Sequence, residues 1–283
     1  MMEIKLIDSN IRHIPSFNGY DEPKNITWYR GNDHKDVIVF SDHHISHVGY
    51  YSGKYRIAWL MEPVAINSNS YNAVIGLQNH FDYIISHDLS FLAQFPKEKQ
   101  VWAPGSGTSL YSDQWAIYPK SKDILTVVGD KRSTEGHRFR HEVVEKFGDR
   151  IDVVGRGYAP FPPEKRVSIY APYKFQIVIH NCAINDYWTD ILTDCFLTGT
   201  VPIVWKGSYI YKYFNLFGCF IFENLDDLNK IVDLINEDGE NIYKSMLPSV
   251  QCNFETIKKY AVVEDYLYEN FFKQFDESIT DIS

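Results

Sequence analysis

Residues 173–207 read YKFQIVIHNCAINDYWTDILTDCFLTGTVPIVWKG, and this stretch decides the fold class. The runs Phe175–Ile179 and Val201–Trp205 are short and rich in β-branched residues, which is typical of buried strands. Between them, apolar side chains recur at the spacing of one helix face, at Trp188, Ile191, Leu192, Cys195 and Phe196. A strand–helix–strand unit is therefore predicted, and units of this kind make an α/β fold.

Both ends of the predicted helix carry residues that suit a helix terminus. Asn185 and Asp186 can cap its start, because a short side-chain oxygen accepts from the free backbone N–H groups of the first turn. Gly199 stands where a left-handed C-terminal cap is expected. The free N–H groups and the positive end of the helix dipole at Tyr187–Asp190 can hold an anion, phosphate above all. A buried crossover without any ligand fits the same pattern equally well.

The composition of the 283-residue chain is that of a folded protein with an acidic balance. Apolar residues make up 45% and aromatic residues 16%, which is enough for a sizeable core. The net charge of −9 argues against nucleic acid as a partner, because phosphate contacts need clustered Lys and Arg. The four cysteines show no CxxC spacing, so free thiols are expected rather than disulfides or zinc. No signal pattern and no apolar run near the ~18–20 residues of a membrane span is found.

Two series of predicted strands indicate two successive α/β domains. The first series is Val37–Phe40, Tyr55–Leu60 and Tyr83–Ser86. The candidate linker is Gly105–Thr108 together with Tyr118–Lys122. The second series comprises strands 123–128, 151–154 and 220–223, helices 136–147 and 225–236, and an aromatic amphipathic run at 249–272. We therefore predict an N-terminal domain at 1–118, a second domain at 119–260, and a C-terminal helix at 261–283 able to cross back to the first.

Residues 173–203 resemble the C-terminal signature of glycosyltransferase family 10, the α-1,3-fucosyltransferase family. The shared positions are Tyr173-Lys174-Phe175, Asn181, Tyr187-x-Thr189 and Gly199-Thr-Val-Pro-Ile203. Three positions depart from the signature: His180 replaces the Glu of Glu-Asn-Ser, Asp190 the Glu of Thr-Glu-Lys, and Ile191 its Lys. In the family the Glu-Lys pair contacts the nucleotide sugar, so these departures leave the identity of the donor open.

The resemblance implies a GT-B fold, in which two Rossmann-like domains face a central cleft. It also implies an inverting, metal-independent hexosyl- or pentosyltransferase that uses a nucleoside-diphosphate sugar, GDP-fucose in the family, and an oligosaccharide or glycoprotein glycan as acceptor. No resident cofactor is expected. Without the membrane anchor of the eukaryotic Golgi members, a bacterial-type or viral enzyme of the cytoplasm (the host cytoplasm if viral) fits better. Two alternatives stay open: the same chemistry with a UDP-linked pentose such as xylose, and a catalytically inactive sugar-binding module.

Cations gather where the predicted strand 123–128 ends and the next helix begins. Together with Val153–Gly157, this segment resembles the family's block of strand, loop and arginine-containing helix, and Arg140 matches the arginine that reaches the donor's diphosphate. A guanidinium suits that role because its fork binds two phosphate oxygens. A solvated basic face, with the cations exposed around a packed apolar stripe, is the alternative. The resemblance implies this set of donor-binding residues: Lys131, Arg140, His180, Asn181, Tyr187, Thr189 and Asp190.

The first domain supplies the candidates for catalysis and acceptor contact. Ala58–Pro63 resembles the family pattern in which a Glu at a strand end is the catalytic base, and Glu62 is the matching position; an ordinary Glu before a turn-forming proline is the alternative. His43, His44 and His47 could bind zinc, but no further ligand type is paired with them, so acceptor contact or plain surface is favoured. The chain has no Asp-x-Asp pair for a nucleotide-bound cation, which predicts a metal-independent reaction.

Overall fold

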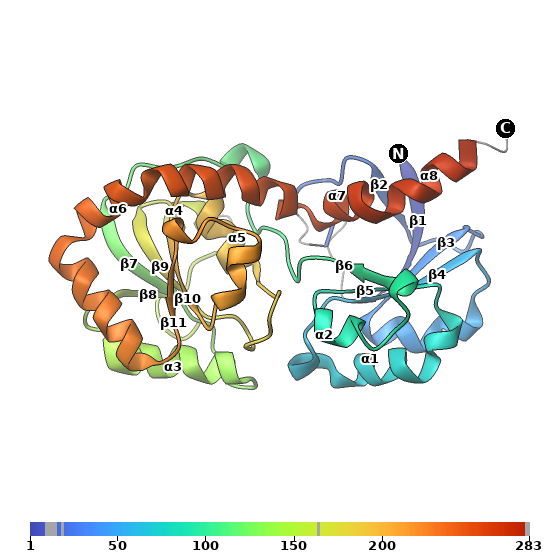
Figure 1. Cartoon of the computed structure of the whole chain (residues 1–283), viewed down its shortest axis with the longest axis horizontal. Coiled ribbons are helices and arrows are strands. Elements are labelled where there is room, and N and C mark those ends of the chain that lie inside the picture. Colours follow the sequence, from blue (N-terminus) through green and yellow to red (C-terminus); the bar gives the residue numbers. More distant parts are fainter. Residues whose placement is uncertain (9–15, 18–19, 163–164, 281–283) are drawn as a thin grey trace. The chain divides into compact units, whose positions relative to one another are not determined.

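A computed structural model describes residues 1–8, 16–17, 20–162 and 165–280. The chain divides into two compact units: unit 1 is Met1–Gly107 with Lys259–Ser283, and unit 2 is Thr108–Lys258. Each unit has its own sheet with helices around it (Figure 1). The predicted α/β class with two Rossmann-like sheets is confirmed. Residues 281–283 of the predicted C-terminal helix lie outside the described residues.

The sheet of unit 1 has six strands in the order β2-β1-β3-β4-β5-β6, and its neighbouring strands are parallel. The strands are β1 (Met2–Ile7), β2 (Ile26–Tyr29), β3 (Val37–Ser41), β4 (Tyr55–Leu60), β5 (Tyr83–Ser86) and β6 (Gln100–Trp102). The sequence predicted β3, β4 and β5 and missed the other three.

Helical segments follow β3, β4 and β5, and a C-terminal group of helices returns to the same unit. The segments between the strands are η1 (Asp42–Tyr50), α1 (Val64–Leu77), η2 (Gln78–His80), α2 (Leu89–Leu92) and η3 (Lys97–Lys99). The C-terminal group is α7 (Val263–Leu267), the π-helix η8 (Tyr268–Phe272) and α8 (Lys273–Thr280).

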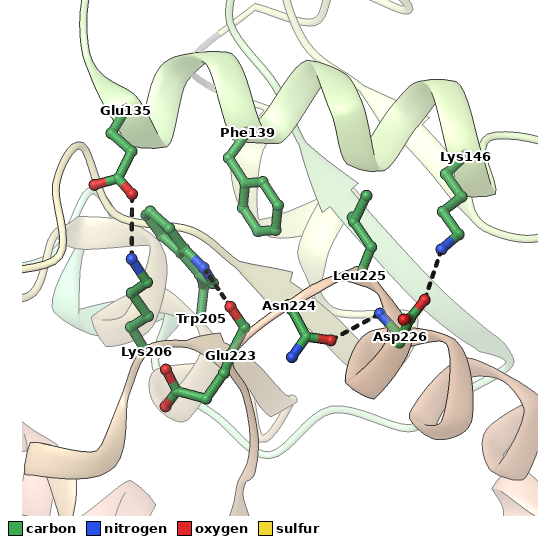
Figure 2. Close-up of a pocket in the computed structure, with 9 residues that line it drawn as sticks. All are labelled: Glu135, Phe139, Lys146, Trp205, Lys206, Glu223, Asn224, Leu225 and Asp226. Atoms are coloured by element: carbon green, nitrogen blue, oxygen red, sulfur yellow. Dashed lines mark hydrogen bonds and ion pairs between the residues drawn. The ribbon is translucent and has the colours of Figure 1, made fainter.

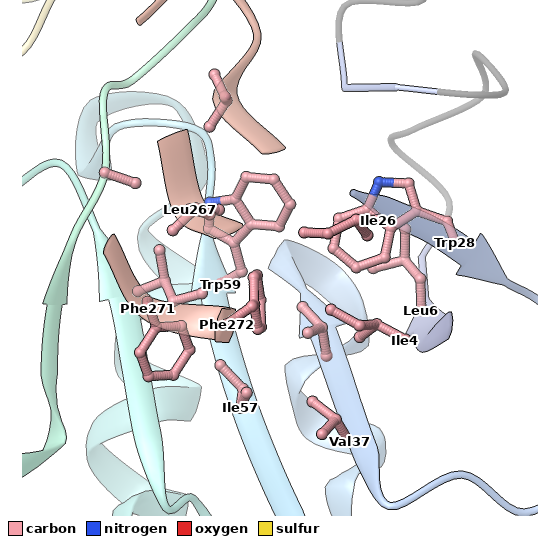
Figure 3. Close-up of a cluster of buried hydrophobic side chains, with 14 of the residues drawn as sticks. Ile4, Leu6, Ile26, Trp28, Val37, Ile57, Trp59, Leu267, Phe271 and Phe272 are labelled. Atoms are coloured by element: carbon pink, nitrogen blue, oxygen red, sulfur yellow. The ribbon is translucent and has the colours of Figure 1, made fainter. Parts of the chain in front are cut away.

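Alternate residues of the buried strand β3 reach two different cores. Val37 and Val39 join a core with Phe272 and its neighbours in the C-terminal group (Figure 3), whereas Ile38 and Phe40 pack with α1 and α2. A central parallel strand requires this two-sided burial. Burying one large apolar side chain contributes about 1.5–3 kcal/mol, so this core holds the C-terminal group on unit 1.

The sheet of unit 2 has five strands in the order β11-β10-β9-β7-β8, again with parallel neighbours. The strands are β7 (Lys122–Val127), β8 (Asp152–Val154), β9 (Tyr173–Val178), β10 (Val201–Trp205) and β11 (Phe220–Phe222). The sequence predicted each of them, β10 with the same ends and the others with small differences at the ends. The strand order reverses between β7 and β9, and in open α/β sheets a ligand binds at the carboxyl ends beside such a switch point.

The helices of unit 2 are α3 (Glu135–Phe147), α4 (Arg166–Tyr170), α5 (Asp190–Leu197) and α6 (Leu225–Ala261), with the short turns η4 (Ser112–Gln114), η6 (Ser208–Lys212) and η7 (Leu216–Gly218). Helices α3 and α6 share a core with β9 and β10. The predicted helix 225–236 and the first part of the run 249–272 belong to one element, α6. Helix α6 is interrupted at Asp238, which has φ −146° and ψ 38°. The chain passes from unit 2 into unit 1 near the end of this helix.

The boundary between the units differs from the predicted one. It lies between Gly107 and Thr108, whereas the sequence placed it after residue 118. The reason is that the connecting segment is bonded to α5: Ala116 N donates to Leu197 O at 3.1 Å, and Tyr118 N donates to Thr198 O at 3.3 Å. Those residues therefore belong to unit 2.

The structure also shows the state of the cysteines and the length and polarity of the helices. All four cysteines are free, with Cys182, Cys195 and Cys219 buried and Cys252 exposed. In the part of the chain that the structure describes, every helix is too short or too polar to cross a membrane.

Candidate functional site

A close approach of two backbones builds the carboxyl edge of unit 2. The first turn of α3 meets the end of β9, where Gly136 N donates to Asn181 O at 3.2 Å. A Cβ at position 136 would lie 1.8 Å from His180 O, so only glycine fits. The contact brings the side chains of α3 and of the segment after β9 together at the β7/β9 switch point.

Arg140 on α3 is inserted into this edge. Its side chain is buried, Nε donates to Ile179 O at 2.8 Å, and Nη2 donates to Asn181 Oδ1 at 3.2 Å. Burial lowers the pKa of Arg140, but a guanidinium stays charged at any ordinary pH. Arg140 is thus not part of a solvated basic face. The described residues provide no hydrogen bond for Nη1, which leaves that nitrogen for a ligand.

His180 lies beside Arg140 and is held neutral. Thr189 N donates to His180 Nδ1 at 3.2 Å, so the ring proton is on Nε2. Burial, and then the charge of Arg140, lowers the pKa of His180 to about 3. Nε2 is buried without a hydrogen-bond partner among the described residues. The ring therefore offers one unused neutral donor at the edge of the sheet.

The start of α5 corrects the predicted helix boundary. The helix begins at Asp190 with Thr189 as its N-cap residue, not after Asn185 and Asp186. Asp186 instead forms a turn with φ 64°, and its carboxylate accepts from Lys212 at 2.8 Å. Gly199 has φ 69°, which confirms the predicted left-handed residue after the helix.

Tyr187 completes the contacts between the segment after β9 and its surroundings. Asn181 Nδ2 donates to Tyr187 Oη at 3.4 Å, and the rings of His180 and Tyr187 lie 5.9 Å apart. Tyr209 Oη donates to the carbonyl of Tyr187 and fixes its backbone. The structure thus brings together all but one of the predicted donor-binding residues.

Asp190 belongs to a polar cluster that the sequence did not reveal. Its Oδ2 accepts from Ser109 Oγ at 2.6 Å and from Arg166 Nη1 at 2.9 Å. Asp194, one turn along α5, is fully buried and accepts from Thr108 Oγ1 at 2.6 Å and from Ser109 N at 3.0 Å. Burial, and then the charge of Asp190, raises the pKa of Asp194.

Lys131 is the donor-site residue that the structure does not bring to the others. It is exposed in the segment between β7 and α3. Its backbone carbonyl lies 3.2 Å from His141 Nε2. Within the described chain its ammonium group makes no hydrogen bond or ion pair, so a role in ligand binding stays a prediction.

The predicted catalytic and acceptor residues lie at the carboxyl ends of β3 and β4 in unit 1. Glu62 follows β4 and is partly exposed, and Tyr71 Oη donates to its carbonyl at 3.2 Å. Asp42, which starts η1 with φ 41°, accepts from Met61 N at 3.1 Å and so ties η1 to the end of β4. The three histidines of η1 are thereby attached to the segment that carries Glu62.

Two of these three histidines contact each other, and the third is exposed. Nδ1 of His44 lies 3.1 Å from Nδ1 of His47, whereas His43 is exposed. Burial, and then His47, lowers the pKa of His44. The described residues contain no group of three or more His, Cys, Asp or Glu side chains that could hold a metal ion.

A separate hollow of about 480 Å³ lies on unit 2 between α3 and the segments after β10 and β11 (Figure 2). The Phe139 and Trp205 rings, 4.8 Å apart, line it. Ion pairs Glu135–Lys206 at 3.1 Å and Lys146–Asp226 at 3.3 Å border it. Its charged groups largely satisfy one another and no predicted site residue lines it, so we do not include it in the site.

Solved structures of other proteins share the fold of this chain. An α1,3-fucosyltransferase solved with GDP is 16% identical over 93% of this chain and 92% of its own, with a TM-score of 0.53. The structure solved with GDP-fucose is 14% identical over 90% of this chain and 89% of its own, also with a TM-score of 0.53. Sucrose-phosphate synthase from Thermosynechococcus elongatus is 11% identical over 88% of this chain and 74% of its own, with a TM-score of 0.60. HepE from Anabaena, solved with UDP-glucose, is 9% identical over 87% of this chain and 79% of its own, with a TM-score of 0.58. The fold is that of the GT-B glycosyltransferases.

Within that class the family follows from the sequence of unit 2. Residues 117–247 match the model of the C-terminal part of glycosyltransferase family 10 (fucosyltransferase). This segment is therefore similar to glycosyltransferase family 10, which confirms the resemblance, and the protein is a glycosyltransferase. No curated protein sequence matches the chain.

Proposed function

We propose that this protein transfers a sugar from a nucleoside-diphosphate donor to a hydroxyl group of an oligosaccharide or glycoprotein glycan, with inversion and without a metal ion. The observation that carries the proposal is the pair of unused donors at the β7/β9 switch point, Arg140 Nη1 and His180 Nε2. One is cationic and one is neutral, and both suit the oxygens of a diphosphate. The similar α1,3-fucosyltransferase solved with GDP and with GDP-fucose supports the same class of donor.

The proposed reaction is a single displacement. Glu62 removes the proton of the acceptor hydroxyl as its oxygen attacks the anomeric carbon. The new glycosidic C–O bond forms on one face while the bond to the diphosphate oxygen breaks on the other, which inverts the anomeric centre. The nucleoside diphosphate leaves with the electron pair. Arg140 stabilises this developing negative charge, and the neutral His180 donates to a phosphate oxygen without adding charge.

Thermal shifts with nucleotides test the donor site. We expect GDP and GDP-fucose to raise the melting temperature more than UDP and UDP-xylose, because the family uses GDP-fucose. A nucleotide at 100-fold its dissociation constant should add about 2.7 kcal/mol of stability. Stronger stabilisation by the UDP compounds would favour the pentose alternative. If none of the four stabilises the protein, the proposed function fails.

Product analysis tests the reaction itself. With the donor chosen by the thermal shifts and a panel of glycan acceptors, we expect release of nucleoside diphosphate and a product whose anomeric configuration, read by NMR, is inverted. A protein that binds the donor but never releases the diphosphate would be the inactive sugar-binding module.

Chelation tests metal independence. Because Arg140 and His180 supply the charge and the donors that a bound ion would otherwise provide, transfer should keep its rate when EDTA is added. The measurement is the initial rate with EDTA, with manganese and with neither. Loss of activity in EDTA and its recovery with manganese would overturn this part of the proposal.

A further inference from the structure

The first two turns of α5 carry two carboxylates and no cation of their own. Asp190 and Asp194 lie one turn apart on the same helix face, where like charges destabilise each other. The helix reads DILTDCFL, so it contains no lysine or arginine that could balance them. The side chain of Asp194 has 0% exposure, which makes an unbalanced charge more costly.

Arg166 on α4 supplies the missing cation from another element. Its Nη1 lies 2.9 Å from Asp190 Oδ2 and 3.7 Å from Asp194 Oδ2. Among the described residues it is the only cation within 4.0 Å of either carboxylate. Ser109, from the segment that enters unit 2, adds its hydroxyl to Asp190 Oδ2 at 2.6 Å.

The arrangement uses only one oxygen of Asp190. Both donors meet Oδ2, while the described residues give Oδ1 no hydrogen bond, and the side chain is 30% exposed. We infer that Arg166 and Ser109 are positioning residues that keep Asp190 ionised and turned so that Oδ1 accepts from a hydroxyl group of the donor nucleotide sugar. This inference rests on the proposed function. The hydroxyl belongs either to the ribose or to the transferred sugar, and the experiment separates these.

The electrostatics around Asp190 agree with this role. Burial alone would raise the pKa of Asp190, but the charge of Arg166 and the hydrogen bonds from Ser109 and Arg166 hold it below its usual range. Other titratable or charged groups also act on Asp190: Asp194 on the same helix, Arg140 on α3, His180 after β9 and Tyr170 on α4. Without Arg166, burial and Asp194 would both favour the protonated form.

The test compares affinity with pH in wild type and variants by calorimetry. Wild type is the reference at each pH between 5 and 8, because the terminal phosphate of GDP and the carboxyl group of Asp194, whose pKa burial raises to about 7, both titrate in this range. Relative to wild type, Arg166→Met should bind at least about tenfold more weakly at pH 5, and its affinity should recover as the pH rises. The reason is that Arg166 lowers the pKa of Asp190 and so keeps this carboxyl group charged, whereas without Arg166 it becomes protonated at low pH. Arg166→Lys should retain much of the wild-type behaviour, and Ser109→Ala should shift in the same direction as Arg166→Met by less.

The two ligands and a second substitution locate the effect. If GDP and GDP-fucose lose affinity equally, the hydroxyl is on the ribose; if only GDP-fucose does, it is on the sugar. In an Asp190→Asn background, Arg166→Met should cause no further loss. An additional loss there would mean that Arg166 contacts the phosphates itself, which overturns the inference.

A ligand-free measurement separates this inference from the proposed function. Carboxyl ¹³C NMR should show a higher pKa for Asp190 in Arg166→Met than in wild type. The matched control is Arg150→Met, which removes a guanidinium that pairs with Asp233 on the surface of unit 2 and should leave Asp190 unchanged. If wild type binds neither nucleotide, the proposed function fails while the titration still decides the role of Arg166. Identical titrations of Asp190 in both proteins would refute that role, and thermal unfolding checks that each variant is folded.

Discussion

Replacing Glu62 with glutamine should slow turnover by about 10²–10⁴-fold while affinity for the donor stays nearly unchanged, because the amide cannot accept the proton of the acceptor hydroxyl. The side chain keeps its size, and the contacts that fix its backbone are retained: the bond from Tyr71 Oη to Glu62 O and the bond from Met61 N to Asp42 at the preceding residue. Steady-state kinetics with saturating donor and acceptor give the turnover, and calorimetry gives the donor affinity.

Glu98→Gln is the matched control for this substitution. Glu98 is an exposed glutamate of the same unit, in η3 before β6, and its replacement should leave turnover unchanged. Asp190→Asn should mainly weaken donor binding. Full turnover in Glu62→Gln combined with its loss in Asp190→Asn would assign the base to Asp190 instead.

The sequence predicted the elements whose side chains are buried in an uninterrupted run. Strands β4, β5 and β10 have the predicted ends, because at least three apolar residues follow one another in each and mark a buried strand. Strand β1 was missed because Glu3 and Lys5 leave no such run. The ammonium group of Lys5 is buried and donates to Asp33 O at 3.0 Å, a contact that the local pattern cannot show.

The candidate site shows the same division between local and distant causes. The family motif identified Arg140, His180 and Asp190, which the structure places together at the edge of unit 2. Arg166 was missed because its contact with Asp190 joins residues 24 positions apart, and no periodicity reports such a pair. The four-residue spacing of Asp190 and Asp194 was a usable signal, since two carboxylates on one helix face require a cation from elsewhere.

The prediction of where α5 begins was wrong for a related reason. Asp186 has a side chain that caps helices well, yet it is buried and used by Lys212 and Tyr213, residues far along the chain. Those contacts hold the turn at φ 64° and move the cap to Thr189. Capping propensity is a local preference, and here the contacts of Asp186 with Lys212 and Tyr213 in another segment override it.

Replacing Arg140 with alanine should cost about 2–4 kcal/mol of transition-state stabilisation, the scale of losing one charge-stabilising donor. Because Ile191 stands where the family has a lysine, Arg140 is expected to carry most of the charge opposite the departing diphosphate. The predicted loss corresponds to about 30- to 1000-fold in kcat/KM at 25 °C. The substitution also leaves Ile179 O and Asn181 Oδ1 without their donor, which should lower the melting temperature, so the kinetics are measured well below it.

Two further arginine variants decide whether this loss is specific. Arg138→Ala removes an exposed guanidinium from the same helix, and its kcat/KM should stay at the wild-type value. Arg140→Lys keeps the positive charge but loses the guanidinium fork. A lysine cannot bond Ile179 O and Asn181 and still have a further nitrogen for the ligand, so the activity of this variant should lie between wild type and Arg140→Ala. If Arg140→Ala keeps wild-type kcat/KM and loses only thermal stability, the buried guanidinium is a structural brace between α3 and β9. The diphosphate would then have to be held by other residues, with Lys131 and His180 the first to replace.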